Sequence, residues 1–224
     1  MEIIPAILPK DFNDLETCIE SVRGFAPVVQ VDICDGRFVS SFSWPYKKHD
    51  TNFEEILRED RGMPAWEDVD YEIDLMVTNP EDDIARWVAA GAARVVIHIE
   101  STKHFDKVLE NATELVEIGI AVSIDTPMAA VDELISTYGN RIRFIQCMGI
   151  DRIGFQGQTF DPKVLDKIRE VRAKYPEMII SVDGGVNHDS ALLLKEAGAN
   201  RLIIGSSIFN EENIPEAIHT FQNI

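Results

Sequence analysis

Carboxylates near the ends of short apolar segments are the feature of this sequence that points most directly to chemistry. Asp32, Asp74 and Asp183 each stand at or near the end of an apolar run with the character of a β-strand. Gln30 lies two residues before Asp32, and Asp35 lies three residues after it. A carboxylate in such a place is costly to bury unless it takes part in chemistry or holds a cation. These five positions are therefore the first candidates for a functional site.

The number of aspartates matters, because a lone aspartate at a strand end more often caps a helix or braces a loop. Two carboxylates ~4 Å apart repel by about 1 kcal/mol in water and by ~4 kcal/mol at an effective dielectric constant of 20. A converging set therefore raises the pKa of at least one member or recruits a cation. Either arrangement suits removal of a proton beside a carbonyl group and stabilisation of the resulting enediolate.

Eight short apolar runs predict the strands that must position these residues. Several are near-continuous Val/Ile segments, as expected of parallel strands that are buried on both faces. The predicted strands are Ile3–Leu8, Val28–Cys34, Val69–Met76, Arg94–Ile99, Ile120–Ile124, Ile142–Met148, Met178–Val182 and Arg201–Ile204. Helical patterns lie between them, with expected N-terminal caps at Asp11, Asn79, Asp161 and Asn187 and expected terminating glycines at Gly24, Gly91, Gly119 and Gly198.

This alternation predicts an α/β fold, a (β/α)8 TIM barrel that spans residues 1–224 as a single domain. An open doubly wound sheet is the alternative, and it is disfavoured because no Gly-x-Gly-x-x-Gly motif follows the first strand. The least regular segment, Ser40–Asp68, is a candidate for a lid or for part of a subunit interface. His49, within it, is expected at the surface.

Side-chain alternation along the strands places the candidate residues at the mouth of the barrel. Gln30 and Asp32 share one face of the second strand, and Asp74 shares a face of the third with Met76. Active sites of such barrels lie at the C-terminal ends of the strands, so we expect the polar faces to meet there. His98, a single histidine on an apolar strand, is interpreted as a core residue.

Three glycine-rich segments are predicted to bind a phosphate group through backbone N–H groups. They follow the sixth, seventh and eighth predicted strands, where barrels of this kind often bind phosphate. The segments are Gly154-Phe155-Gln156-Gly157-Gln158, Asp183-Gly184-Gly185-Val186-Asn187 and Gly205-Ser206-Ser207-Ile208-Phe209. Ordinary tight turns are the alternative interpretation of each segment.

Composition narrows the class of protein. The formal net charge of −18 argues against partners such as nucleic acid or an anionic membrane surface, and it requires that any phosphate pocket be built locally. The start of the chain lacks the features of a signal peptide, and no apolar run is long enough to span a membrane. The three cysteines, Cys18, Cys34 and Cys147, form neither a disulfide framework nor a zinc motif, which suits a cytoplasmic protein.

The motifs resemble those of the ribulose-phosphate 3-epimerase family along nearly the whole chain. The matching segments are Pro5–Leu8, Val31–Val39, Asp74–Val77 with Asn79-Pro80, Gly154–Gln158, Val182–Val186 and Gly205–Phe209. The resemblance implies a reversible inversion at C3 of a ketopentose 5-phosphate, with Asp32 and Asp183 transferring protons on opposite faces of the substrate. It also implies a divalent metal ion that stabilises the enediolate, and a homo-oligomer.

The same resemblance assigns further positions. The residues expected to contact the substrate or its phosphate are Met76, Gly154, Phe155, Gln156, Gly157, Gly184, Gly185, Gly205 and Ser206. The expected metal ligands are Gln30, Asp32, Asp74 and Asp183, where Gln30 and Asp74 replace the two histidines of the family. Such an all-oxygen set predicts Mg²⁺ or Mn²⁺ rather than Zn²⁺ or Fe²⁺.

Other departures from the family pattern leave two alternatives open. Ala6 replaces the serine of the first motif, and Cys34 replaces a methionine. The loop after the sixth strand is one residue longer than usual and carries Arg152, a candidate cation for the phosphate or for a second acidic group. The alternatives are another phosphosugar isomerase or lyase on the same barrel, and a non-catalytic phosphosugar-binding protein.

Overall fold

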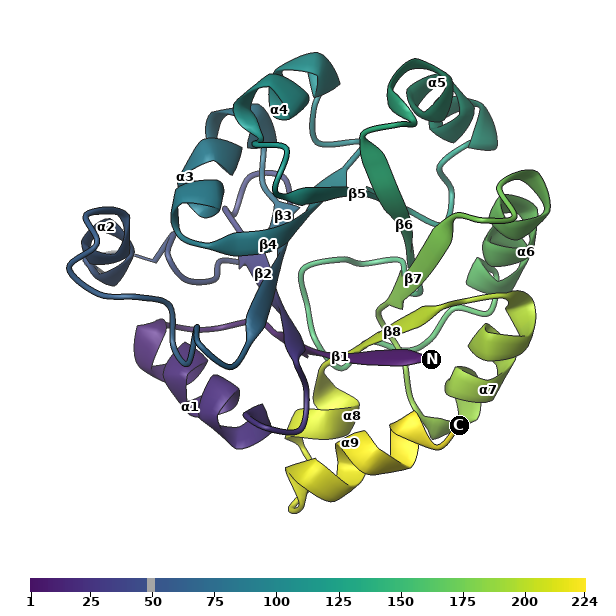
Figure 1. The fold of residues 1–224 in the computed structure, drawn as a ribbon. Coiled ribbons are helices and arrows are strands. Elements are labelled where there is room, and N and C mark those ends of the chain that lie inside the picture. The colour runs from purple at the N-terminus through teal and green to yellow at the C-terminus, as the bar shows by residue number, and fades with distance from the viewer. Residues whose placement is uncertain (48–50) are drawn as a thin grey trace.

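Eight parallel strands form a closed barrel in the computed structural model, which describes residues 1–47 and 51–224 (Figure 1). The strands are β1 (Glu2–Ile7), β2 (Val28–Cys34), β3 (Asp70–Met76), β4 (Ala92–His98), β5 (Glu117–Val122), β6 (Ile142–Met148), β7 (Ile179–Asp183) and β8 (Arg201–Ile204). Each strand pairs with the next along the chain, and β8 pairs with β1 to close the ring. The predicted (β/α)8 TIM barrel is therefore confirmed.

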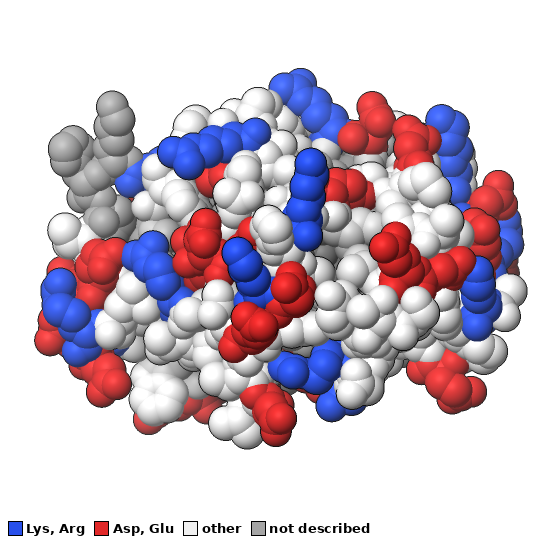
Figure 2. Space-filling model, turned by 90° about the horizontal axis from the view of Figure 1, so that it is seen from above, with Lys and Arg blue, Asp and Glu red and all other residues white. Residues whose placement is uncertain are grey.

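Helices surround the barrel and connect successive strands (Figure 1). They are α1 (Phe12–Val22), α2 (Asn52–Leu57), the 3₁₀ helix η1 (Pro80–Asp82), α3 (Ile84–Ala89), α4 (Phe105–Asn111), α5 (Met128–Tyr138), α6 (Val164–Lys174), α7 (His188–Ala197), α8 (Ser206–Phe209) and α9 (Ile214–Gln222). The last helix packs against β1 and α1, so the chain ends near its start. On the face that Figure 2 shows, acidic and basic side chains are intermingled.

Alternation along the strands separates an apolar outer layer from a polar barrel interior. Val29, Val31 and Ile33 on β2 are fully buried in the cluster that fills the space between the barrel and the helices. Gln30 and Asp32, on the other face of β2, are buried inside the barrel. The polar face of β2 therefore points inward, as the sequence predicts.

Ion pairs close the N-terminal end of the barrel. Oε2 of Glu72, a fully buried residue on β3, lies 3.5 Å from Arg94 Nη1 and 3.6 Å from Arg201 Nη1. Glu2 pairs with the same two arginines at 3.2 Å and 3.0 Å. Burial raises the pKa of Glu72 to about 7, although both arginines act to lower it. Every carboxylate of this lower network thus has a guanidinium partner.

The connection between α4 and β5 differs from its prediction. The helix ends at Asn111 rather than at Gly119, and the strand begins at Glu117 rather than at Ile120. Gly119 lies inside β5, where an added Cβ atom would be 2.3 Å from Cε2 of Phe144 in the barrel interior. This glycine therefore makes room for the Phe144 ring and does not terminate a helix.

Of the four predicted helix caps, two make side-chain capping hydrogen bonds to their helices, and the other two, Asn79 and Asp161, do not. The helix α6 begins at Val164, three residues after Asp161, and has no side-chain capping bond. The side chains of Asp11 and Asn187 accept hydrogen bonds from backbone N–H groups in the first turns of α1 and α7. Asn79 makes no capping hydrogen bond and has a left-handed backbone with φ of 55°. Asn79 does stand at the N-cap position with Pro80 after it, as predicted, but the helix that follows is the short 3₁₀ helix η1.

The irregular segment Ser40–Asp68 is anchored on the outside of the barrel by Trp44. This fully buried ring lies 5.5 Å from Phe12, 5.5 Å from Phe53 and 5.8 Å from Trp87, measured between ring centroids. Its role as a lid or interface stays a prediction, and the predicted surface position of His49 lies outside the described residues. In the described part of the chain, no helix is both long and apolar enough to cross a membrane.

Candidate active site and metal centre

Three aspartates meet at the C-terminal end of the barrel, as the sequence predicts. The register between β2 and β3 pairs Asp32 with Asp74, and the register between β6 and β7 pairs Met148 with Asp183. One carboxylate oxygen of each aspartate lies within 4.8 Å of those of the other two. Asp74 is completely buried, whereas Asp32 and Asp183 are 8% and 9% exposed and so reach the mouth.

Two glutamine amides bridge the three carboxylates. Gln30 Nε2 lies 2.8 Å from Asp32 Oδ1 and 3.2 Å from Asp183 Oδ2. Gln146 Nε2 lies 3.1 Å from Asp74 Oδ2 and 3.4 Å from Asp183 Oδ2. The Oε1 atoms of both glutamines are buried and accept no hydrogen bond from residues 1–47 or 51–224. A buried acceptor without a partner costs about 1–3 kcal/mol. Each amide therefore donates from Nε2 to the carboxylates while its Oε1 atom remains unpaired at that cost.

His98 completes the cluster from β4. Its Nε2 atom is 3.0 Å from Asp74 Oδ1, and both side chains are fully buried. Burial by itself lowers the pKa of the imidazole, but the charge of Asp74 and the hydrogen bond to it raise the pKa of His98 above its ordinary value. His98 is buried like a core residue, as interpreted from the sequence, yet it also belongs to the polar site.

Positive charge is scarce around these aspartates. Apart from His98, no cationic side chain in the described ranges forms an ion pair with Asp32, Asp74 or Asp183. Burial, followed by the charges of the other two aspartates, raises the pKa of Asp32 well above its ordinary value. Burial and then the charge of Asp74 raise the pKa of Asp183 to about 7. A carboxyl group whose pKa is about 7, as for Asp183, can both hold and release a proton near neutral pH.

The raised pKa of Asp183 predicts a stability that falls as the pH rises. The folded chain holds this proton up to about pH 7, whereas an unfolded aspartate releases it near ~3.9. The proton therefore stabilises the fold fully below the unfolded pKa, and this contribution is lost as the pH rises through the folded pKa. In metal-free buffer we expect the urea midpoint of the wild-type chain to fall more steeply between about pH 4.5 and about pH 7.5 than that of Asp183→Asn. Parallel curves would contradict this prediction.

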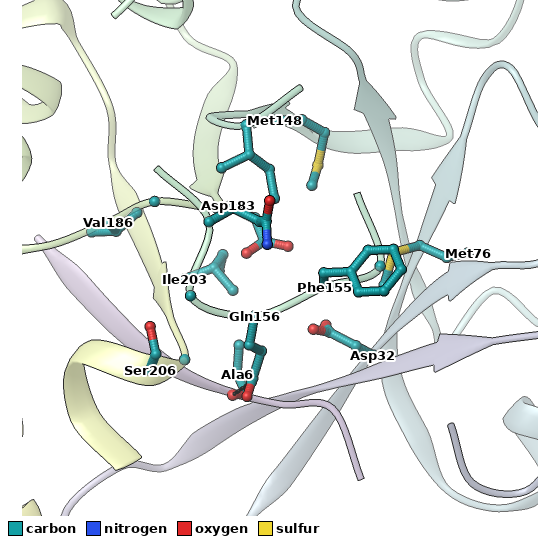
Figure 3. Close-up of a pocket in the computed structure, with 17 residues that line it drawn as sticks. Ala6, Asp32, Met76, Met148, Phe155, Gln156, Asp183, Val186, Ile203 and Ser206 are labelled. Carbon is teal, nitrogen blue, oxygen red and sulfur yellow. Dashed lines mark hydrogen bonds between the residues drawn. The ribbon is translucent and has the colours of Figure 1, made fainter. Parts of the chain in front are cut away.

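A small pocket lies against Asp32 and Asp183 (Figure 3). In Figure 3, Asp32 approaches the pocket from β2 and Asp183 approaches it from β7, with their carboxylates directed toward the same space. Every residue predicted to contact substrate also lines this pocket, namely Met76, Gly154, Phe155, Gln156, Gly157, Gly184, Gly185, Gly205 and Ser206. The remaining lining residues are Ala6, Met148, Ile150, Gln158, Val186 and Ile203.

The turn after β7 has the geometry of an anion-binding concavity. Gly184 and Gly185 adopt φ values of 99° and 67°, in the region that favours glycine. An added Cβ at Gly185 would lie 2.5 Å from the Cα atom of Phe160. Within the described part of the chain, neither of the two glycine N–H groups donates a hydrogen bond. Successive free N–H groups in such a turn are suited to bind an oxyanion.

The loop Gly154–Gln158 covers the mouth of the barrel (Figures 1 and 3). Gln156 Nε2 donates a 3.0 Å hydrogen bond to the backbone oxygen of Ala6, and the Arg152 guanidinium lies 4.2 Å from the centre of the Phe155 ring. The enclosed volume is about 40 Å³, whereas pockets for small-molecule ligands typically measure ~300–1,000 Å³. The loop must therefore move for a ligand of that size to enter.

The residues of the cluster fit a divalent cation. Asp32, Asp74 and Asp183 supply closely spaced carboxylate oxygens that have no lysine or arginine partner in the described ranges. Gln30 adds a buried amide oxygen that has no hydrogen-bond partner there. Carboxylate and amide oxygens are the ligands that hard divalent cations prefer, and buried carboxylates need a compensating charge.

Comparison with known proteins finds relatives along the whole chain. Residues 2–209 match the ribulose-phosphate 3 epimerase family. The ribulose-phosphate 3-epimerase of Bacillus subtilis is 29% identical over 226 residues, which cover 97% of this chain and 96% of the relative. A protein of the same name from Synechocystis is 30% identical and covers 99% and 93% of the two chains. The relative named as the cytoplasmic isoform in Oryza sativa is 29% identical, with 97% and 91% covered.

Solved structures of other enzymes share the fold. The 3-hexulose-6-phosphate synthase of Salmonella typhimurium superposes with a TM-score of 0.73 at 12% identity, covering 100% of this chain and 97% of the other. The orotidine 5'-phosphate decarboxylase of Pyrococcus horikoshii gives a TM-score of 0.65 at 18% identity, with 99% and 97% covered. At these identities the likeness establishes the barrel architecture alone.

Proposed function

The chain belongs to the ribulose-phosphate 3-epimerase family, and we propose that it inverts C3 of a ketopentose 5-phosphate, interconverting ribulose 5-phosphate and xylulose 5-phosphate. One observation carries this proposal. Asp32 and Asp183, both with raised pKa values, reach one pocket from different sides of the barrel. Inversion of a carbon centre requires a base on one face and an acid on the other, and two such carboxyl groups meet that requirement.

The proposed chemistry is proton transfer between these aspartates and C3. The ionised aspartate takes the C3 proton, which is acidic because the C2 carbonyl lies next to it. The second aspartate, protonated at the start, gives its proton to the opposite face of C3. In the chain without a cation, Gln30 bridges the two carboxylates, since its Nε2 atom contacts both of them.

We propose a divalent cation as the cofactor, held by Gln30, Asp32, Asp74 and Asp183. When bound, it supplies positive charge beside the substrate oxygens that become negative as C3 loses its proton. The all-oxygen donor set favours Mg²⁺ or Mn²⁺ over Zn²⁺ or Fe²⁺. His98 orients the Asp74 carboxylate through their 3.0 Å contact.

The substrate phosphate is proposed to bind backbone N–H groups in the turns after β7 and β8. Gly184 and Gly185 supply the first of these turns, and Gly205 and Ser206 supply the second. With a net charge of −18 the protein does not attract a phosphate by its overall field, so these local donors must supply the affinity.

We also propose that the protein works in the cytoplasm as a homo-oligomer of single barrel domains. The name of the Oryza sativa relative as a cytoplasmic isoform supports the compartment. The net charge of −18 opposes binding to nucleic acid and to anionic membrane surfaces, which leaves the phosphorylated ketose as the proposed ligand.

Hydrogen exchange at C3 in D₂O tests the function. With Mg²⁺ or Mn²⁺ present, we expect deuterium to enter C3 of ribulose 5-phosphate as xylulose 5-phosphate forms, and we expect chelation to stop both. Zn²⁺ is expected to support the reaction less well. A product with a moved carbonyl group or a cleaved carbon–carbon bond would assign a different isomerase or lyase. Tight binding of the sugar phosphate without exchange would assign a binding protein.

A further inference from the structure

Gln146 lies among the proposed metal ligands. It belongs to none of the family motifs, and its sequence context does not indicate a metal ligand. The side chain projects from β6 and is completely buried. Its Nε2 atom lies 3.1 Å from Asp74 Oδ2 and 3.4 Å from Asp183 Oδ2. Its Oε1 atom is buried and has no hydrogen-bond partner within residues 1–47 and 51–224. The tip of this amide is therefore next to two carboxylates. If it turns, its carbonyl edge loses no hydrogen bond, and a cation between the carboxylates would replace the two contacts that Nε2 gives up.

A glutamine amide presents two chemically different edges, which a rotation of 180° about its last torsion exchanges. The Nε2 edge donates to carboxylates, as both Gln146 and Gln30 do. The Oε1 edge repels carboxylates but is a good ligand for a hard cation lying between them. Gln30 on β2 shows the same combination of an Nε2 atom shared by two carboxylates and an Oε1 atom without a partner.

We propose that Gln146 is a further ligand of the divalent cation and binds it through Oε1. The donor set then consists of three carboxylates and two amide oxygens. This inference rests on the proposed metal-dependent function. An amide oxygen adds a ligand without adding a fourth negative charge to Asp32, Asp74 and Asp183, and it strengthens the preference for Mg²⁺ or Mn²⁺ over softer ions.

Calorimetric titration of the full chain with MnCl₂, MgCl₂ and ZnCl₂, in the absence of substrate, tests the proposal. Gln146→Leu keeps a side chain of similar size beside the apolar Phe144 and Met148, and we expect it to weaken Mn²⁺ binding by about 10–100-fold. Gln146→His replaces the oxygen ligand by an imidazole, and we expect the ratio of Zn²⁺ affinity to Mn²⁺ affinity to rise about tenfold or more. A residue that merely positions the aspartates would leave that ratio unchanged.

Ser181→Ala is the matched control. Ser181 pairs with Gln146 in the register between β6 and β7, and it is buried with an Oγ atom that has no partner among the described residues. We expect its Mn²⁺ affinity to equal that of the wild-type chain. Should Gln146→Leu fail to fold, the affinity ratio of Gln146→His decides.

Three outcomes would each overturn the proposal. Gln146→Leu could bind Mn²⁺ with the wild-type affinity, or Gln146→His could leave the ratio of Zn²⁺ affinity to Mn²⁺ affinity unchanged. The third is a wild-type chain that binds neither Mn²⁺ nor Mg²⁺. The titration is independent of catalysis. A chain that binds Mn²⁺ through Gln146 but exchanges no C3 hydrogen would end the epimerase proposal and leave the ligand assignment intact. Exchange of the C3 hydrogen, with no effect of the Gln146 substitutions on Mn²⁺ binding, would support the epimerase proposal and end the ligand assignment.

Discussion

Replacement of either Asp32 or Asp183 by asparagine is expected to lower the rate of epimerisation by about 10²–10⁴-fold, as measured by the conversion of ribulose 5-phosphate. The amide has nearly the shape of the carboxyl group but neither accepts nor releases a proton at C3. Burial raises the pKa of both carboxyl groups, so their ionised forms are disfavoured in the folded chain. We therefore expect both variants to fold, and a loss of rate then reports chemistry rather than stability.

Each variant is expected to retain one half of the reaction. The remaining aspartate still takes the C3 hydrogen from the epimer that presents that hydrogen on its side of the pocket, and solvent then replaces the proton. In D₂O, Asp32→Asn and Asp183→Asn should therefore label opposite epimers at C3 without interconverting them. Labelling of the same epimer by both variants would contradict the assignment of one aspartate to each face.

Asp35→Asn controls for the same chemical change three residues away. The Asp35 carboxylate accepts hydrogen bonds from the backbone N–H groups of Arg37, Phe38 and Thr78, and so it braces the loop after β2. Asparagine keeps the Oδ1 acceptor for Arg37 and Phe38 and loses only the bond from Thr78 to Oδ2, so we expect epimerisation at close to the wild-type rate. An equally large loss in Asp35→Asn would mean that damage to the loop, rather than lost proton transfer, explains the Asp32 result.

The barrel and most of its site could be predicted because the relevant signals are local. Near-continuous apolar runs such as Val95–Ile97 fix the parallel strands, and alternation within β2 fixes which face carries Gln30 and Asp32. Because the C-terminal ends of all the strands meet at one mouth, residues at strand ends such as Asp183 and Gly184 were expected to converge there. The pocket gathers them.

The parts that could not be predicted depend on contacts between distant residues. Gly119 has the sequence context of a helix end, and only the Phe144 ring lying against it explains a glycine inside β5. Gln146 and His98 lie on apolar strands, where a single polar residue is usually part of the core. Alternation along β6 puts Gln146 on the same face as Phe144 and Met148. The contacts with Asp74 that give Gln146 a role are visible only in three dimensions.

Gly185→Ala, in the turn after β7, is expected to remove phosphate recognition, which is the second large effect on activity. An added Cβ would lie 2.5 Å from Cα and 2.7 Å from N of Phe160. A clash with backbone atoms is not relieved by a rotamer change, so the N–H groups of Gly184 and Gly185 must shift. We expect kcat/KM for ribulose 5-phosphate to fall about 100-fold, or about 2.7 kcal/mol at 1.36 kcal/mol per factor of ten, mainly through KM.

Gly24→Ala separates this clash from the backbone strain that accompanies it. Gly24 has a φ of 81°, similar to the 67° of Gly185, but an added Cβ would meet nothing within 4 Å. It lies between α1 and β2, on the side of the barrel away from the pocket. Alanine at either position costs about 1–3 kcal/mol of strain, so urea midpoints should fall in both variants while KM rises in Gly185→Ala alone. An unchanged KM in Gly185→Ala would show that the phosphate binds elsewhere, because the turn cannot keep its present position around the added methyl group.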